Sequence, residues 1–91
     1  MQYVVCYDIS DDARRSRLAN ILLDFGSRAQ ESVFLAHLDE ELASKMVERV
    51  RRCIEEHQDR VHIFALCDAC VPKIQVLGTA ELAAERDFYI L

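Results

Sequence analysis

The chain has 91 residues, of which 52% are hydrophobic, with only two glycines and one proline, so we expect one globular domain, 1–91, without a disordered tail or linker. Its formal net charge of −5 is opposite in sign to that of a typical freestanding nucleic-acid-binding protein. Contact with nucleic acid would therefore require a local patch of arginines, a bound metal ion or a basic partner.

The first half of the chain predicts a strand followed by a helix. Residues 2–8 form an apolar run that predicts a strand with two buried faces. Residues 11–25 predict a helix, because apolar side chains recur with the i, i+3, i+4, i+7 spacing of one helical face. Ser10 or Asp11 is suited to cap its beginning, and Gly26 is suited to the C′ position after its end.

The second half of the chain alternates further strands with one more helix. The predicted elements are, in order, a strand (28–37), a helix (40–57) and three strands (60–67, 72–77 and 87–91). Asp39 is expected to cap the helix. Its apolar stripe is predicted to consist of Leu42, Met46, Val50, Cys53 and Ile54.

We assign these elements to an α+β, ferredoxin-like βαββαβ arrangement with an extra C-terminal strand. Two helices then cover one face of the sheet, while the other face is also apolar and requires a partner. The simplest partner is a second copy related by a two-fold axis, which gives a sheet-on-sheet homodimer. In that homodimer the last strand, 87–91, would pair with a sheet edge of the other copy.

The sequence contains no apolar run close to the roughly 20 residues that a membrane-spanning helix needs, and no signal peptide is apparent. We therefore expect a cytoplasmic protein without membrane contact. Its four cysteines should be thiols in that reducing compartment. Cys67-Asp-Ala-Cys70 lacks the second ligand pair of a structural zinc site, so structural thiols are favoured over metal binding or redox chemistry.

Asp8 is the main candidate for chemistry, because it places a carboxylate at the rigid end of a strand. Magnesium needs only one or two carboxylates, so two copies of Asp8 in a two-fold dimer would suffice to hold an ion that activates water against a phosphodiester. Arginines in the first turns of the following helix lie within reach to neutralise phosphate. The alternative is that Asp8 only accepts hydrogen bonds from the backbone amides of residues 9–12. The pattern leaves both interpretations open.

Several segments, in order along essentially the whole chain, resemble one protein family. They are Val5-Cys6-Tyr7-Asp8-Ile9-Ser10-Asp11-Asp12 with Arg14-Arg15, the segment from Gly26 to Phe34, Leu66-Cys67-Asp-Ala-Cys70, Val76-Leu77-Gly78 and Asp87-Phe88-Tyr89-Ile90. Together they are similar to the small CRISPR-associated adaptation proteins of the "Cas-two" family.

This resemblance implies a ferredoxin-like homodimer in which Asp8 of each subunit is the catalytic residue and binds Mg²⁺, with Mn²⁺ as the alternative ion. Members are described as metal-dependent endonucleases that hydrolyse single-stranded RNA or double-stranded DNA in antiviral defence. The family also forms the central dimer of the spacer-acquisition complex, flanked by the CRISPR integrase. Its functional arginines and phenylalanine fall on Arg15, Arg17, Arg28 and Phe34, and the arginines are expected to bind nucleic acid.

Two positions depart from the family pattern: Leu35 stands where many members carry glutamate, and Ala29 stands where valine is frequent. The first departure leaves the site with fewer acids. Two functions of different class therefore stay open, an endonuclease in which Asp8 is catalytic and a non-catalytic scaffold that holds DNA and the integrase. The acidic net charge favours the scaffold, because affinity for DNA would then come from the partner. The choice between RNA and DNA as substrate also stays open.

Overall fold

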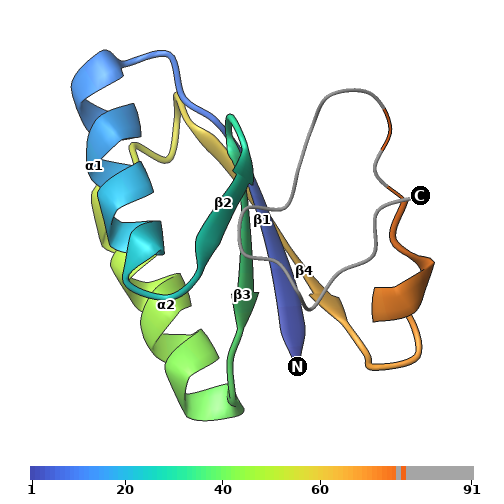
Figure 1. Ribbon diagram of the computed structural model, residues 1–91. Helices are drawn as coiled ribbons and strands as arrows, with labels where there is room; N and C mark the ends of the chain where they lie inside the picture. Colours follow the sequence, from blue (N-terminus) through green and yellow to red (C-terminus); the bar gives the residue numbers. More distant parts are fainter. Residues whose placement is uncertain (76, 78–91) are drawn as a thin grey trace.

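The computed structural model of the protein describes residues 1–75 and residue 77. The elements are β1 (Gln2–Asp8), α1 (Asp12–Leu23), β2 (Ser27–Gln30), β3 (Val33–His37), α2 (Glu40–Cys53), β4 (Arg60–Leu66) and a short 3-10 helix, η1 (Val71–Lys73). Both α-helices cover the same face of one sheet (Figure 1). The predicted α+β class and βαββαβ order are therefore confirmed. Neither α-helix of the described part has the length and apolar character needed to cross a membrane.

The sheet is antiparallel, with the strand order β2-β3-β1-β4 of a ferredoxin-like fold. In the central strand β1, Val5 lies opposite Phe34 of β3 and Ile63 of β4. Because side chains alternate along a strand, these three residues share the face that the helices cover. At the far end of β1, Asp8 lies opposite Arg60, the first residue of β4.

The core lies between the helices and this face of the sheet. Its largest fully buried side chains, with less than 2% exposure, come from two strands and both helices: Val5, Leu18, Leu22, Phe34 and Met46. Tyr7 and Phe34 stack at its edge, with ring centroids 6.1 Å apart. Burial of such side chains stabilises the fold by about 1.5–3 kcal/mol each.

Both α-helices begin at aspartate caps that the sequence predicted. The carboxylate of Asp11 accepts a hydrogen bond from the Arg14 amide at 2.9 Å, and that of Asp39 accepts one from the Leu42 amide at 2.8 Å. The helix predicted over 40–57 ends earlier, at Cys53, because the backbone of the next residue turns to an extended conformation with ψ of 160°. Leu42, predicted to be on the buried stripe, is exposed.

The single strand predicted over 28–37 is wrong, because this segment forms the hairpin of β2 and β3. The chain reverses at Glu31 and Ser32, and Ser32 has a φ of 66°, in the left-handed region. The pairing of the two strands also shifts between Arg28 and Gln30, which is the sign of a β-bulge. Splitting this segment supplies the two consecutive strands of the βαββαβ order.

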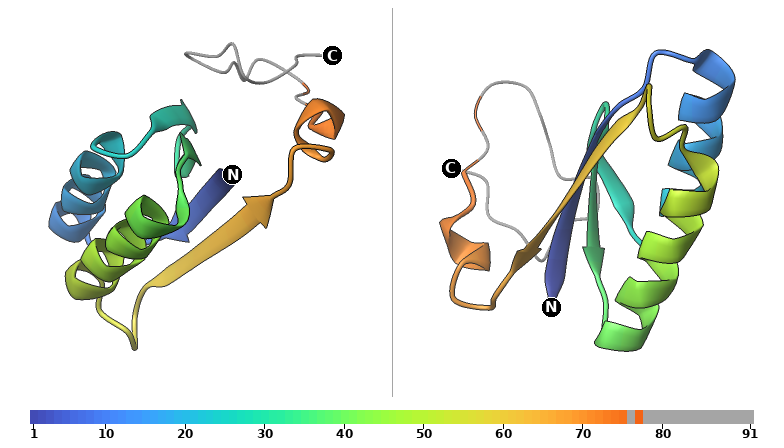
Figure 2. Two further views of the ribbon diagram at one scale, coloured as in Figure 1. Left: turned by 90° about the horizontal axis from the view of Figure 1, so that it is seen from below. Right: turned by 180° about the vertical axis from the view of Figure 1, so that it is seen from behind.

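The strand predicted over 72–77 is also wrong for the described residues of that range. Pro72 lies in η1, and local hydrogen bonds from the Cys70 amide to Cys67 O and from the Lys73 amide to Cys70 O, both 2.9 Å, coil the chain there. This segment lies on the opposite side of the sheet from the α-helices (Figure 2). The predicted strand 87–91 falls outside the described residues.

Gly26 has a different role from the predicted C′ cap. The α1 C-cap is Asp24, so Gly26 comes two residues later, where the chain enters β2. A Cβ atom on Gly26 would lie 2.0 Å from the carbonyl oxygen of Leu35, which is far shorter than a van der Waals contact. The glycine is therefore required by the close approach of this turn to β3 rather than by helix termination.

Candidate functional site

Asp8 lies exposed at the end of β1. Because Val5 and Tyr7 face the helices, the side chain of Asp8 points to the opposite, helix-free face of the sheet. No residue of the described part donates a hydrogen bond to its carboxylate, and the cap of α1 is Asp11 instead. The hydrogen bonds that the alternative interpretation requires, from the amides of residues 9–12 to Asp8, are thus not present among the described residues.

Arg15 holds the turn that follows Asp8. Its Nη1 donates a hydrogen bond to the carbonyl oxygen of Ile9 at 3.0 Å, and its Nη2 forms an ion pair with Asp12. The sequence predicted that Arg15 binds nucleic acid. In the structure it also fixes the backbone that carries the catalytic candidate, and part of its charge is already compensated.

A second arginine at the start of α1 ties the helix to the residue that precedes β4. Arg14 contacts the carboxylate of Asp59 through both Nε, at 2.7 Å, and Nη2, at 2.9 Å, and the Glu55 amide donates to the same carboxylate at 2.7 Å. The hydrogen bond from Arg14 is the main reason why the pKa of Asp59 lies below its ordinary value. Asp59 immediately precedes Arg60, so this pair fixes the position of the residue opposite Asp8.

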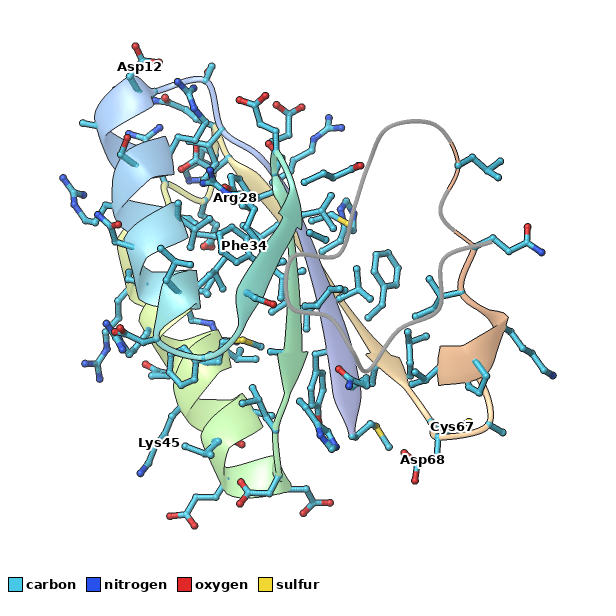
Figure 3. The ribbon with its side chains drawn as sticks, viewed as in Figure 1. Asp12, Arg28, Phe34, Lys45, Cys67 and Asp68 are labelled. Carbon is cyan, nitrogen blue, oxygen red and sulfur yellow. The ribbon has the colours of Figure 1, made fainter. Side chains whose placement is uncertain are left out.

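The predicted residues Arg28 and Phe34 lie together at the end of the core. The Arg28 Cζ atom is 5.3 Å from the centroid of the Phe34 ring, a cation–π contact (Figure 3). They adjoin a pocket of about 330 Å³ lined by Tyr7, Arg15, Ser16, Ala19, Asn20, Arg28, Glu31 and Ser32. The structure thus brings two of the three predicted nucleic-acid-binding arginines to one concave site.

Arg17 does not join this pocket. It is exposed on α1, and its role in nucleic-acid binding stays a prediction. Asp8 does not line the pocket either, although its neighbour Tyr7 does. The Tyr7 amide donates to Ser32 O at 3.1 Å, which places the pocket and Asp8 at the same end of the sheet. The Asp8 carboxylate and the two arginines therefore lie at the same end of the sheet but on opposite faces.

The single carboxylate of Asp8 can supply one of the two protein ligands of a magnesium site. No group of three or more His, Cys, Asp or Glu side chains suited to a metal occurs in the part of the chain that the structure describes. An exposed carboxylate such as Asp8 is nevertheless what Mg²⁺ requires, because water and phosphate oxygens complete its coordination shell. A second carboxylate would have to come from the Asp8 of another copy.

The leucine at position 35 does not remove an acid from the vicinity of Asp8 in the same chain. Leu35 is buried opposite Val4, four residues along β1 from Asp8. Four residues of an antiparallel strand span about 13 Å, so side chains at these two positions are too far apart to bind the same metal ion.

Arg60 was not predicted from the sequence as a residue near the site. Antiparallel pairing of the two predicted strands, 2–8 and 60–67, would have placed it opposite Asp8.

The antiparallel βαββαβ sheet and the carboxylate at the end of its central strand define a small ferredoxin-like α+β protein. The family model for CRISPR associated protein Cas2 matches residues 1–74. The chain belongs to this family.

Relatives and solved structures agree with this assignment. The chain is similar to CRISPR-associated endonuclease Cas2 2 of Thermus thermophilus, with 39% identity over 98% of this chain and 94% of the relative. It is also similar to CRISPR-associated endoribonuclease Cas2 of Mycobacterium tuberculosis, with 50% identity over 97% of this chain and 75% of the relative. A crystal structure of a hypothetical protein from Thermus thermophilus superimposes with a TM-score of 0.80 and 41% identity, covering 89% of this chain and 94% of that one.

Proposed function

We propose that this chain is a metal-dependent endonuclease that hydrolyses phosphodiester bonds of single-stranded RNA or double-stranded DNA, with Asp8 as its metal-binding catalytic residue. The observation that carries the proposal is the exposed Asp8 carboxylate, which has no hydrogen-bond donor in the described part of the chain and sits on backbone fixed by Arg15. Two relatives named endonuclease and endoribonuclease support the activity.

The active form in this proposal is a two-fold homodimer that pairs the helix-free faces of two sheets. Apolar side chains on this face support it: Val4, Cys6, Phe64 and Leu66. Phe64 is 52% exposed although it is a large aromatic residue in the middle of a strand. Asp8 points to the same face, so an interface there brings the two Asp8 carboxylates of the dimer toward each other.

Each residue has a separate role in this mechanism. Asp8 of both copies would hold Mg²⁺, or Mn²⁺ as the alternative ion, which supplies a nucleophilic water at neutral pH and neutralises phosphate charge. Arg28 lies exposed over Phe34 and offers its guanidinium to a phosphate at the edge of the sheet. Arg15 keeps the turn after Asp8 in place and also lines the same pocket. Arg17, which is exposed on α1 outside this pocket, is a further candidate for a phosphate contact.

A second candidate function is a scaffold: the dimer would hold DNA at the centre of a spacer-acquisition complex, flanked by the CRISPR integrase. The observation in its favour is that most arginines already face carboxylates. Arg14, Arg15, Arg49, Arg51 and Arg52 all form ion pairs, and the net charge is −5. Affinity for DNA would then depend on the integrase, and Asp8 would be dispensable.

The replacement Asp8→Asn distinguishes the two functions, because it removes the charge and keeps the shape. The purified variant is assayed for cleavage of single-stranded RNA and double-stranded DNA with Mg²⁺, and for spacer acquisition in cells. Asp68→Asn is the matched control, since Asp68 is an exposed aspartate in the turn after β4. The enzyme proposal expects cleavage to vanish in Asp8→Asn only. Full cleavage by Asp8→Asn would refute it, and undiminished spacer acquisition would favour the scaffold.

A further inference from the structure

Two thiols face each other in the turn that follows β4. The Sγ atoms of Cys67 and Cys70 are 3.5 Å apart, and both residues are exposed. The turn is closed by hydrogen bonds from the Cys70 and Val71 amides to Cys67 O, at 2.9 and 3.3 Å. It lies at the opposite end of the molecule from Arg28 and Phe34 (Figure 3). These thiols therefore take no part in the proposed nucleic-acid site.

The two thiols are chemically unequal. The pKa of Cys67 is lowered, first by its hydrogen bond with Cys70 and then by the backbone amides of Ala69 and Cys70. The pKa of Cys70 is raised, first by the same side-chain hydrogen bond and then by the negative charge on Cys67. These contacts favour the thiolate on Cys67 and the remaining proton on Cys70. This is the division between an attacking and a resolving cysteine.

We propose that Cys67 and Cys70 form a thiol–disulfide exchange site whose oxidant is a small-molecule disulfide such as glutathione disulfide. The Cys67 thiolate attacks one sulfur of the oxidant, a mixed disulfide forms, and the oxidant's S–S bond breaks to release one thiolate, which takes a proton from water. Cys70 then loses its proton to water and attacks the Cys67 sulfur, which releases the second thiolate. The protein dithiol is oxidised by two electrons, and one disulfide is reduced to two thiols.

The rest of the described structure restricts this chemistry to the one pair. Cys53 is buried, and its Sγ lies 3.9 Å from the carbonyl oxygen of Arg14. Cys6 is partly buried in β1. Among the described residues, neither Cys6 nor Cys53 has a second thiol beside its sulfur. Both cysteines therefore serve as internal controls for the reactivity of the exposed pair. Two sulfurs alone do not complete the four-ligand shell of a structural zinc ion, and no third donor of the described residues joins them.

The first test equilibrates the folded wild-type protein with mixtures of reduced and oxidised glutathione. Free thiols are then alkylated, and each cysteine is located by peptide mass spectrometry. The proposal expects Cys67 and Cys70 to lose reactivity together, in a disulfide that dithiothreitol reverses, while Cys6 and Cys53 stay unpaired. Absence of the Cys67–Cys70 disulfide in excess glutathione disulfide would overturn it, and so would stoichiometric zinc in the purified protein.

The second test separates the roles of the two thiols with Cys70→Ser and Cys67→Ser, both in an exposed turn where serine is accommodated. Cys70→Ser should accumulate a mixed disulfide with glutathione at Cys67. Cys67→Ser should form the corresponding adduct at Cys70 more slowly, because the backbone amides of Ala69 and Cys70 that lower the pKa of Cys67 remain in Cys70→Ser and still favour its thiolate. Equal rates, or a faster reaction at Cys70, would overturn the assignment of Cys67 as the attacking thiol.

Discussion

Arg14 and Asp59, which lie 45 positions apart in the chain, form an ion pair through two parallel contacts of 2.7 and 2.9 Å. Asp59 is buried, and the Glu55 amide satisfies the same carboxylate oxygen as Arg14 Nε. The pair joins the first turns of α1 to the residue before β4. The ion pair therefore fixes the two chain segments that carry Asp8 and Arg60 relative to each other, although it includes neither Asp8 nor Arg60.

This ion pair predicts a specific loss of stability in acid. Because the folded-state pKa of Asp59 is depressed, its stabilising contribution is present above the unfolded value of about 3.9 and is lost as the pH falls through the lower folded value. The replacement Asp59→Asn should lower the denaturation midpoint at pH 7 and flatten its dependence on pH below about 4. Urea denaturation between pH 7 and pH 3 measures both effects. A variant as stable as wild type at pH 7 would contradict this assignment.

The exposed position of Arg28 predicts a change in the salt dependence of nucleic-acid binding. Loss of one phosphate contact in Arg28→Ala should weaken binding and reduce the slope of log K against log salt concentration by about 0.7 for a single strand or 0.9 for a duplex. Arg52→Ala is the matched control, because Arg52 pairs with Glu48 on α2, away from the pocket. Fluorescence anisotropy at several salt concentrations measures the slope, and equal slopes for the two variants would exclude Arg28 from the interface.

The sequence was sufficient for the class of fold because its strongest patterns are local. Three kinds of pattern act within a few residues: the apolar run of β1, the spacing of Leu18 and Leu22 in α1, and the caps Asp11 and Asp39. The hairpin inside 28–37 escaped prediction because its reversal uses Ser32 with a positive φ, where glycine or asparagine would have been the usual signal.

The candidate site was less predictable because it depends on contacts between distant segments. Asp8 was identified from the strand that precedes it, and Arg28 and Phe34 from the family resemblance. The hydrogen bond from Arg15 to Ile9 O depends on the direction of a side chain, which residue spacing does not reveal. The Arg14–Asp59 ion pair joins two segments that are far apart in the sequence. Pro72 was assigned to a strand start, whereas hydrogen bonds at Cys67 and Cys70 coil the chain there.

The close approach at Gly26 predicts a large effect from one added methyl group. In Gly26→Ala the new Cβ would lie 2.0 Å from Leu35 O and 2.9 Å from the Ala36 Cα, so backbone has to move. Overpacking of this kind costs roughly 1–3 kcal/mol in the free energy of unfolding. Ser27→Ala, one residue further along, is the control and should change stability little. Chemical denaturation of the two variants tests this, and equal stabilities would show that the turn relaxes freely.

The proposed dimer predicts that Phe64 and Leu23 respond differently to the same replacement. Both are large, exposed apolar residues, with 52% and 54% exposure, but Phe64 lies on the helix-free face of β4 and Leu23 at the end of α1. Phe64→Glu removes an apolar side chain from each copy and adds two like charges to the interface. Burial of the exposed half of each ring is worth about 1 kcal/mol, so the two copies together should raise the dimer Kd at least roughly thirtyfold.

Leu23→Glu should leave the same Kd unchanged, because α1 covers the other face of the sheet. Sedimentation of both variants over a range of protein concentrations measures the monomer–dimer equilibrium, and circular dichroism confirms that each variant is folded. If wild type is a stable folded monomer at micromolar concentration, the sheet-on-sheet dimer is wrong. If Leu23→Glu dissociates the dimer and Phe64→Glu does not, the interface lies on the helical layer. The two Asp8 carboxylates would then be too far apart to share one metal ion.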